Sequence, residues 1–220
     1  ANYLQNLDFH NNADIMKNII TYYTKAKAFQ SLAGFYESCA QVEIDEYRDY
    51  EKALGALKEG IKYASKANND ELGADLQQRV YVMERFVLAR RSIKNDPQES
   101  EQICLKLLDS KDAENAIRVG DCFALLIEYY HSVGRMDEAY DLMERMKARR
   151  IVLNPYLERS MMDDICRAVG KDLEGGNGNG NGGAGGYNEM KIGEDGDDGS
   201  IEESIGEEVD ELDESLGSED

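Results

Sequence analysis

The stretch FALLIEYYHSVGRMDEAYDLM, residues 123–143, carries the spacing that decides the fold of this chain. Its apolar side chains recur every three or four residues on each side of Gly134. That period gathers side chains on one face of an α-helix, and glycine readily ends a helix. The stretch therefore predicts two helices joined by a tight turn.

The positions within this hairpin follow the tetratricopeptide pattern. The pattern has an aromatic residue, a leucine three residues later, a tyrosine four after that, an alanine nine further on and a large apolar residue after four more. The matching positions are Phe123, Leu126, Tyr130, Ala139 and Met143. Because a two-helix unit cannot bury its apolar face alone, such units stack into arrays.

Another hairpin of the same pattern lies nearer the N-terminus and contains extra residues. Phe29, Leu32 and Tyr36 match its first helix, and Ala53 and Leu57 match its second. The interval from Tyr36 to Ala53 is 17 residues, which is longer than the pattern requires. The predicted packing residues of both hairpins are Phe29, Leu32, Tyr36, Tyr50, Ala53, Leu57, Phe123, Leu126, Tyr130, Ala139 and Met143.

The extra residues lie within GFYESCAQVEIDEYRDYEKAL, residues 34–54. The apolar stripe continues through Cys39 and Val42, so we expect the insertion to lengthen the first helix. The acids of EIDEYRDY then fall at the start of a helix beginning near Tyr47, where the helix dipole favours negative charge. A metal site or reactive thiol is the alternative, and we favour packing because Cys39 lies on the apolar stripe.

Helical spacing extends over residues 1–170, and sustained strand alternation is nearly absent. One apolar stripe runs from Tyr47 through Tyr50 and Leu57 to Ala64. Asp96 and Pro97 predict a helix start, and a last helix is expected from about Tyr156 to Val169. Roughly eight helices are predicted, which gives an all-α fold. We expect a right-handed α-solenoid of tetratricopeptide-like helical hairpins over residues 1–170.

The end of the chain differs in composition. Residues 171–186 form a Gly/Asn-rich linker, and residues 187–220 are expected to form a disordered acidic tail. Residues 175–220 hold 15 acidic residues and one basic residue. Ser200 and Ser204 each precede a glutamate by three positions and are candidate phosphorylation sites. Spaced apolar residues offer an alternative to a solvated tail, namely a segment that binds a groove. These residues are Ile201, Ile205, Val209, Leu212 and Leu216.

The sequence gives little basis for catalysis or metal binding. The two histidines, His10 and His131, do not make a metal cage, and no hydrolase or phosphate-loop motif occurs. The run GGNGNGNGGAGG formally contains GxGxxG, but no strand precedes it and no helix follows, so we interpret it as linker. The four cysteines show no CxxC, which favours reduced core thiols. We predict no enzyme, no catalytic, metal or cofactor-binding residues, no cofactor and no small-molecule substrate.

The net charge of the chain argues against some classes of binding partner. The net charge of −20 argues against nucleic acid and against anionic membrane surfaces, and no apolar run is long enough to span a bilayer. Basic residues form two clusters, which we interpret as solvated helix ends. The alternative is that these clusters bind a partner protein or make a transient contact with the acidic tail. They are Arg90, Arg91 and Lys94, and Lys147, Arg149 and Arg150.

Three segments also resemble a known family. They are DIMKNIITYYTKAKAFQSLAGFYESCAQVEIDEYRDYEKALGAL, ARRSIKNDPQESEQICLKLL and AIRVGDCFALLIEYY. They are similar to the C-terminal helical-repeat region of the intraflagellar transport subunit one-forty family, and LAGFYESCAQVEIDEY is the most distinctive run. The resemblance covers roughly residues 1–170 and does not extend to the tail. Family members carry N-terminal WD40 propellers, so we expect this chain, which opens on Ala1, to be a fragment.

The resemblance implies a non-catalytic scaffold segment of intraflagellar transport complex A. It implies subunit assembly for retrograde ciliary transport and for ciliary import of membrane cargo, with other complex A subunits as protein partners. The implied location is the cytoplasm and the cilium or flagellum, at the basal body and axoneme. The alternatives are a helical-repeat adaptor of another coat-like vesicle transport complex and an all-α protein that regulates an enzyme.

Overall fold

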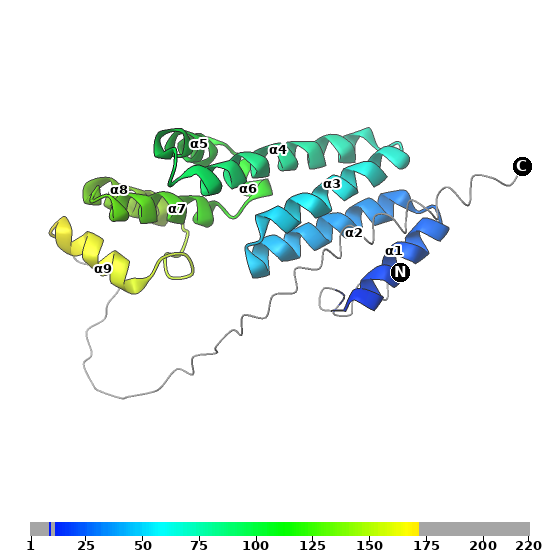
Figure 1. Ribbon diagram of the computed structural model, residues 1–220, viewed down its shortest axis with the longest axis horizontal. Coiled ribbons are helices and arrows are strands. Elements are labelled where there is room, and N and C mark those ends of the chain that lie inside the picture. Colours follow the sequence, from blue (N-terminus) through cyan, green and yellow to red (C-terminus); the bar gives the residue numbers. More distant parts are fainter. Residues whose placement is uncertain (1–8, 10–11, 172–220) are drawn as a thin grey trace, which may run out of the picture.

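The computed structural model describes residues 9 and 12–171, which contain helices and no strand (Figure 1). The helices are α1 Ala13–Lys25, α2 Phe29–Val42, α3 Tyr50–Lys66, α4 Asp70–Ser92, α5 Pro97–Asp109, α6 Ala113–Ala116, α7 Val119–Ser132, α8 Met136–Ala148 and α9 Arg159–Ala168. The prediction of an all-α, tetratricopeptide-like array is confirmed. The acidic tail 187–220, with Ser200 and Ser204, lies outside the described residues.

Side-chain caps fix where four of the helices begin. In each, the side chain accepts a hydrogen bond of 3.0–3.1 Å from the backbone N–H three residues later, which otherwise has no partner in the first turn. The capping residues are Asn12, Asp49, Asn69 and Asp96. Pro97 follows Asp96 as the first residue of α5, as predicted. Gly134 has a φ of +78° between α7 and α8, which confirms the predicted turn.

The helices stack as successive hairpins. The pair α2 and α3 forms the first hairpin, and α7 and α8 form the last (Figure 1). The longest helix, α4, packs against α3, α5 and α6 and so connects the two. Helix α9 packs against α8 and buries Ile165 and Cys166 while exposing Asp164 and Arg167. Its polar outer face is typical of a helix that caps an array.

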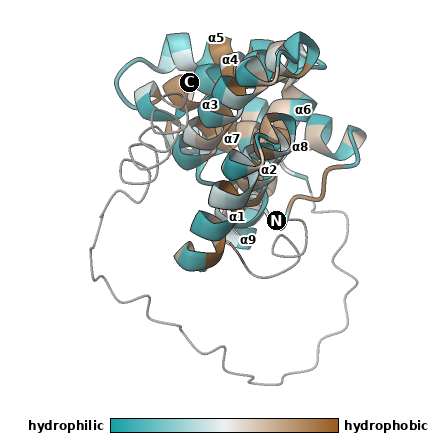
Figure 2. Ribbon diagram, turned by 90° about the vertical axis from the view of Figure 1, so that its right-hand side faces the viewer, coloured by the Kyte–Doolittle hydropathy of each residue, from teal (hydrophilic) through white to brown (hydrophobic). Residues whose placement is uncertain are grey.

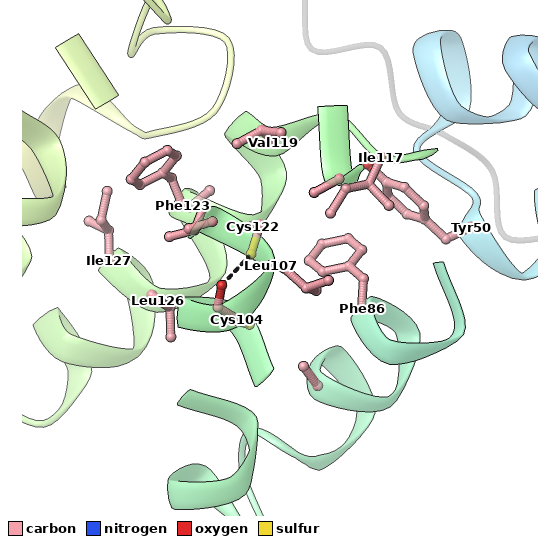
Figure 3. Close-up of a cluster of buried hydrophobic side chains, with 14 of the residues drawn as sticks. Tyr50, Phe86, Cys104, Leu107, Ile117, Val119, Cys122, Phe123, Leu126 and Ile127 are labelled. Carbon is pink, nitrogen blue, oxygen red and sulfur yellow. Dashed lines mark hydrogen bonds between the residues drawn. The ribbon is translucent and has the colours of Figure 1, made fainter. Parts of the chain in front are cut away.

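Apolar side chains are buried between the helices. Coloured by hydropathy, the ribbon shows hydrophilic and hydrophobic residues interleaved along the helices (Figure 2). One core cluster runs from the end of α2 to α9, and a smaller cluster joins α1, α2 and α3. Figure 3 shows the centre of the larger cluster, where Tyr50 of α3 meets Phe86 of α4. Their ring centroids lie 4.9 Å apart, edge to face. Because the core is continuous across the hairpins, each hairpin depends on its neighbours.

The four cysteines are free thiols inside this core, as predicted. Cys122 Sγ donates a weak hydrogen bond to the carbonyl oxygen of Cys104 at 3.6 Å, drawn in Figure 3. Burial, followed by the charge of Glu43, raises the pKa of Cys39 to about 12. Cys39 is therefore a protonated thiol that packs like a small apolar side chain.

The insertion between Tyr36 and Ala53 lengthens α2 as expected, but the position predicted for the acids is wrong. Residues Glu43–Tyr47 form a π-helical turn that continues α2. Helix α3 begins at Tyr50, so most of the acids of this stretch lie at the end of α2 and not at the start of α3. Tyr47 also leaves the predicted stripe, with 49% of its surface exposed. The extra residue of a π turn rotates its side chain off the α-helical face.

Two further expectations need correction. The last helix begins at Arg159, and Tyr156 lies in the preceding loop. Of the basic clusters, Arg90 and Arg149 are not simply solvated. The Arg90 guanidinium lies 5.4 Å from the ring centre of Tyr50, and Arg149 donates a hydrogen bond to a backbone carbonyl of the neighbouring helix α5. The planar guanidinium stacks on rings and donates to carbonyls, so it serves packing as well as solvation.

A charged cluster ties α5 to α7 and to the start of α8. The Tyr130 hydroxyl donates to Glu101 Oε1 at 2.6 Å. Arg135 donates to both oxygens of Glu101, at 3.0 Å and 3.3 Å, and lies 4.1 Å from the Tyr130 ring centre. Burial opposes ionisation of Glu101, but the hydrogen bonds from Arg135 and Tyr130 prevail and lower its pKa.

We expect Glu101→Gln to lower the free energy of unfolding at pH 7 by about 1 kcal/mol, because a charged acceptor for two donors is lost. A lowered folded-state pKa adds stability above the unfolded pKa and loses it as the pH falls through the folded pKa. The difference between the two proteins should therefore be complete at pH 7 and shrink below the ordinary value of 4.5. Urea unfolding at several pH values measures it.

The control is Glu99→Gln, an exposed change on the same helix, which we expect to alter stability by less than about 0.5 kcal/mol. A Glu101→Gln effect that stays constant from pH 7 to pH 3 would show that the charge of Glu101 contributes nothing.

Candidate functional site

The two tetratricopeptide-like hairpins meet at a largely buried carboxylate, Asp121, near the start of α7. The Tyr50 hydroxyl, from the start of α3, donates a hydrogen bond to Asp121 Oδ2 at 2.6 Å. Tyr50 is 1% exposed, and the Asp121 side chain is 10% exposed. Burial, followed by the negative charge of Asp121, raises the pKa of Tyr50 well above its ordinary value. The tyrosine therefore stays protonated and acts as the donor.

Two arginines surround the same carboxylate. Arg48 Nε lies 3.6 Å from Asp121 Oδ1, and Arg118 Nε lies 4.0 Å from Oδ2. Arg118 also donates to the carbonyl oxygen of Asp45 at 2.9 Å, at the end of the lengthened α2. A carboxylate that is removed from water is costly unless it is paired and hydrogen-bonded. The position of Asp121 therefore depends on these partners.

The position of Arg48 depends on the insertion in the first hairpin. It follows the π-helical turn and has a φ of +54°, in the left-handed region that is uncommon for residues other than glycine. This conformation ends α2 and directs the side chain away from the hairpin. Arg48 then donates a hydrogen bond to the carbonyl oxygen of Pro155, in the loop before α9.

Tyr156 completes the contact from that loop. The guanidinium carbons of Arg48 and Arg118 lie 5.3 Å and 5.1 Å from its ring centre, within the range of cation–π attraction. Its ring also covers Gly120, where a methyl group would lie 2.6 Å from Cε2 and closer still to two other ring atoms. We call Arg48, Tyr50, Arg118, Asp121 and Tyr156 the junction cluster.

A groove of about 540 Å³ opens beside the junction cluster. Its apolar lining includes Ile44, Ile117 and Ile151, and its charged lining includes Glu114 and Arg149. Lining of both kinds suits a polypeptide segment, which offers apolar side chains together with backbone and charged groups. The groove is formed by three separate parts of the chain, the end of the lengthened α2, the stretch from α6 to the start of α7 and the segment after α8.

The predicted packing residues lie mainly in the core. Nine are buried, namely Leu32, Tyr50, Ala53, Leu57, Phe123, Leu126, Tyr130, Ala139 and Met143. Phe29 and Tyr36 are half-buried and stack on Tyr63, with ring centroids 6.2 Å and 5.6 Å from it. Only Tyr50 of this set belongs to the junction cluster.

The other four members of the junction cluster were missed by sequence reasoning. Asp121 and Arg118 flank the repeat pattern, Arg48 lies in the insertion, and Tyr156 was assigned to a helix. The available signal was Gly120, a glycine inside helix-forming sequence, which often marks a close approach of another group.

Within residues 9 and 12–171, no group of three or more His, Cys, Asp or Glu side chains is arranged to hold a metal ion. His131 Nε2 lies 3.9 Å from Asp164 Oδ2 and so connects α7 to α9. Among the helices that the structure describes, none combines the length and apolar character needed to cross a membrane.

We expect Gly120→Ala to destabilise the fold by about 1–3 kcal/mol, because the methyl group displaces Tyr156 from between the two arginines. The matched control is Gly34→Ala in α2, where a methyl group meets nothing within 4 Å and should stabilise by about 0.5–1 kcal/mol. Both variants are compared by urea unfolding. Equal stability of the two would contradict the close contact at Gly120.

A comparison with protein-family models extends these observations. The model that describes the C-terminal TPR domain of intraflagellar transport subunit one-forty matches residues 30–147, which is more than half of the chain. The match includes both hairpins and every member of the junction cluster except Tyr156. It supports a general role as a scaffold segment of the intraflagellar transport machinery, associated with the cilium. The chain belongs to the family of C-terminal TPR domains of intraflagellar transport subunit one-forty.

Proposed function

We propose that this chain is a non-catalytic scaffold segment of intraflagellar transport complex A that holds sister subunits together. The observation that carries the proposal is the junction cluster, which holds two repeat hairpins in a fixed relation beside an open groove. A scaffold needs fixed geometry, because each partner then meets a surface that is already formed.

By the same proposal, the assembled complex serves retrograde transport in the cilium and ciliary import of membrane cargo. The chain acts in the cytoplasm, at the basal body and along the axoneme. Its partners are proteins, and it takes no nucleic acid and no small-molecule substrate. Family membership supports this assignment, and the acidic net charge agrees with it because nucleic acids and anionic membranes select basic surfaces.

We assign the groove beside the junction cluster as one contact site for a sister subunit. Glu114 is exposed at its edge, in the first turn of α6, and has no ion pair within the described residues. A charge reversal there changes the groove without breaking a contact of the fold.

The test is affinity capture from ciliated cells with the full-length protein carrying Glu114→Arg. The control is Glu71→Arg, which places the same reversal at another exposed first-turn glutamate, on α4 and away from the groove. Both changes replace an exposed first-turn glutamate by arginine, so the control carries the same change in charge at a site outside the groove.

We expect Glu71→Arg and the unmodified protein to recover complex A subunits equally, and Glu114→Arg to lose at least one of them. Recovery of coat-complex components by the unmodified protein, in place of complex A subunits, would contradict the proposed function. Equal recovery by both variants would remove the groove as the contact site.

A further inference from the structure

Helices α3 and α4 expose a row of apolar side chains on the outside of the array. Two ion pairs show which residues of α3 lie opposite which residues of α4. Lys58 Nζ lies 3.0 Å from Glu84 Oε1, and Arg91 Nε lies 3.3 Å from Glu51 Oε1. On each helix the two paired residues are seven positions apart, which is two turns and about 10 Å.

Between and beyond these ion pairs, the same antiparallel register sets apolar residues opposite each other. Leu54 faces Leu88, and Ile61 faces Tyr81. Leu88 is 42% exposed and Tyr81 is 60% exposed, while Leu54 and Ile61 are half-buried at the edge of the core. We call these four residues the α3–α4 strip. Its two apolar rungs are also seven residues apart.

Beside the strip lies positive charge that the described residues do not neutralise. Arg85 lies between Tyr81 and Leu88 on the same face of α4, and it has no ion pair within the described part of the chain. Lys94, just beyond the end of α4, likewise has none there. An acidic ligand with apolar side chains seven residues apart would complement this surface.

The chain itself contains such a segment. Residues 201–216, IEESIGEEVDELDESL, hold eight acidic residues and no basic residue. Ile205 and Leu212 are seven residues apart, as are Val209 and Leu216. Twenty-nine residues separate Lys171 from this segment, and they are Gly-rich at their start. We infer that residues 201–216 bind to the α3–α4 strip of the same molecule.

In this arrangement the apolar residues of the segment cover Tyr81 and Leu88, and its acids lie near Arg85. The segment shields the strip, so any protein that binds the same surface has to displace it. The inference concerns a different surface from the groove and does not depend on the proposed function.

The test uses the whole 220-residue chain with a photo-crosslinking benzoylphenylalanine in place of Tyr81. The matched control carries the same probe in place of Tyr22, which is 52% exposed on α1. Mass spectrometry identifies the crosslinked peptide, and a mixture of isotope-labelled and unlabelled chains separates contacts within one molecule from contacts between two.

We expect the probe at position 81 to crosslink to residues 201–216 of the same chain and the probe at position 22 not to do so. Leu212→Asp should reduce the yield about tenfold, since one buried leucine contributes at least that factor. This change lies in the tail and leaves the helical array untouched. Crosslinks between labelled and unlabelled chains, a yield unchanged by Leu212→Asp, or no crosslink to residues 201–216 would each overturn the inference.

Discussion

A carboxylate that is largely removed from water needs hydrogen bonds and opposite charge around it, and Asp121 is such a group at the contact between the two hairpins. Removing an aspartate from water costs several kcal/mol unless hydrogen bonds and opposite charge compensate. Tyr50 supplies the hydrogen bond, and Arg48 and Arg118 supply the charge. These partners come from the start of α3, the end of the lengthened α2 and the residue before α7. All three segments must therefore occupy their positions together, which turns a stack of hairpins into one body.

The insertion that interrupts the first repeat thereby gains a structural role. A standard tetratricopeptide hairpin turns soon after its consensus tyrosine, whereas this chain continues through a π-helical turn to Arg48. Arg48, at the end of that extension, contacts both Asp121 and the loop before α9. The insertion also brings Ile44 and Asp45 to the groove, so the same residues stabilise the junction and shape the candidate binding surface.

Much of the fold could be predicted from the sequence, and the site could not. Features that depend only on near neighbours in the chain can be recognised from the sequence. They include the helical spacing of apolar residues, the helix cap at Asp96 and the turn at Gly134. The junction cluster depends on groups far apart in the chain, and their meeting follows from the stacking of the helices. Arg48 and its hydrogen-bond partner Pro155, for example, are 107 residues apart. The π turn was missed because it differs from an α-helix by one residue, which shifted the predicted start of α3 to Tyr47.

The hydrogen bond between Tyr50 and Asp121 couples the two hairpins. A double-mutant cycle with Tyr50→Phe and Asp121→Asn, measured by urea unfolding, tests it most directly. We expect the two changes not to be additive, with a coupling energy of about 1 kcal/mol or more. Additivity within about 0.3 kcal/mol would mean that the two side chains contribute independently, and the claim would be contradicted.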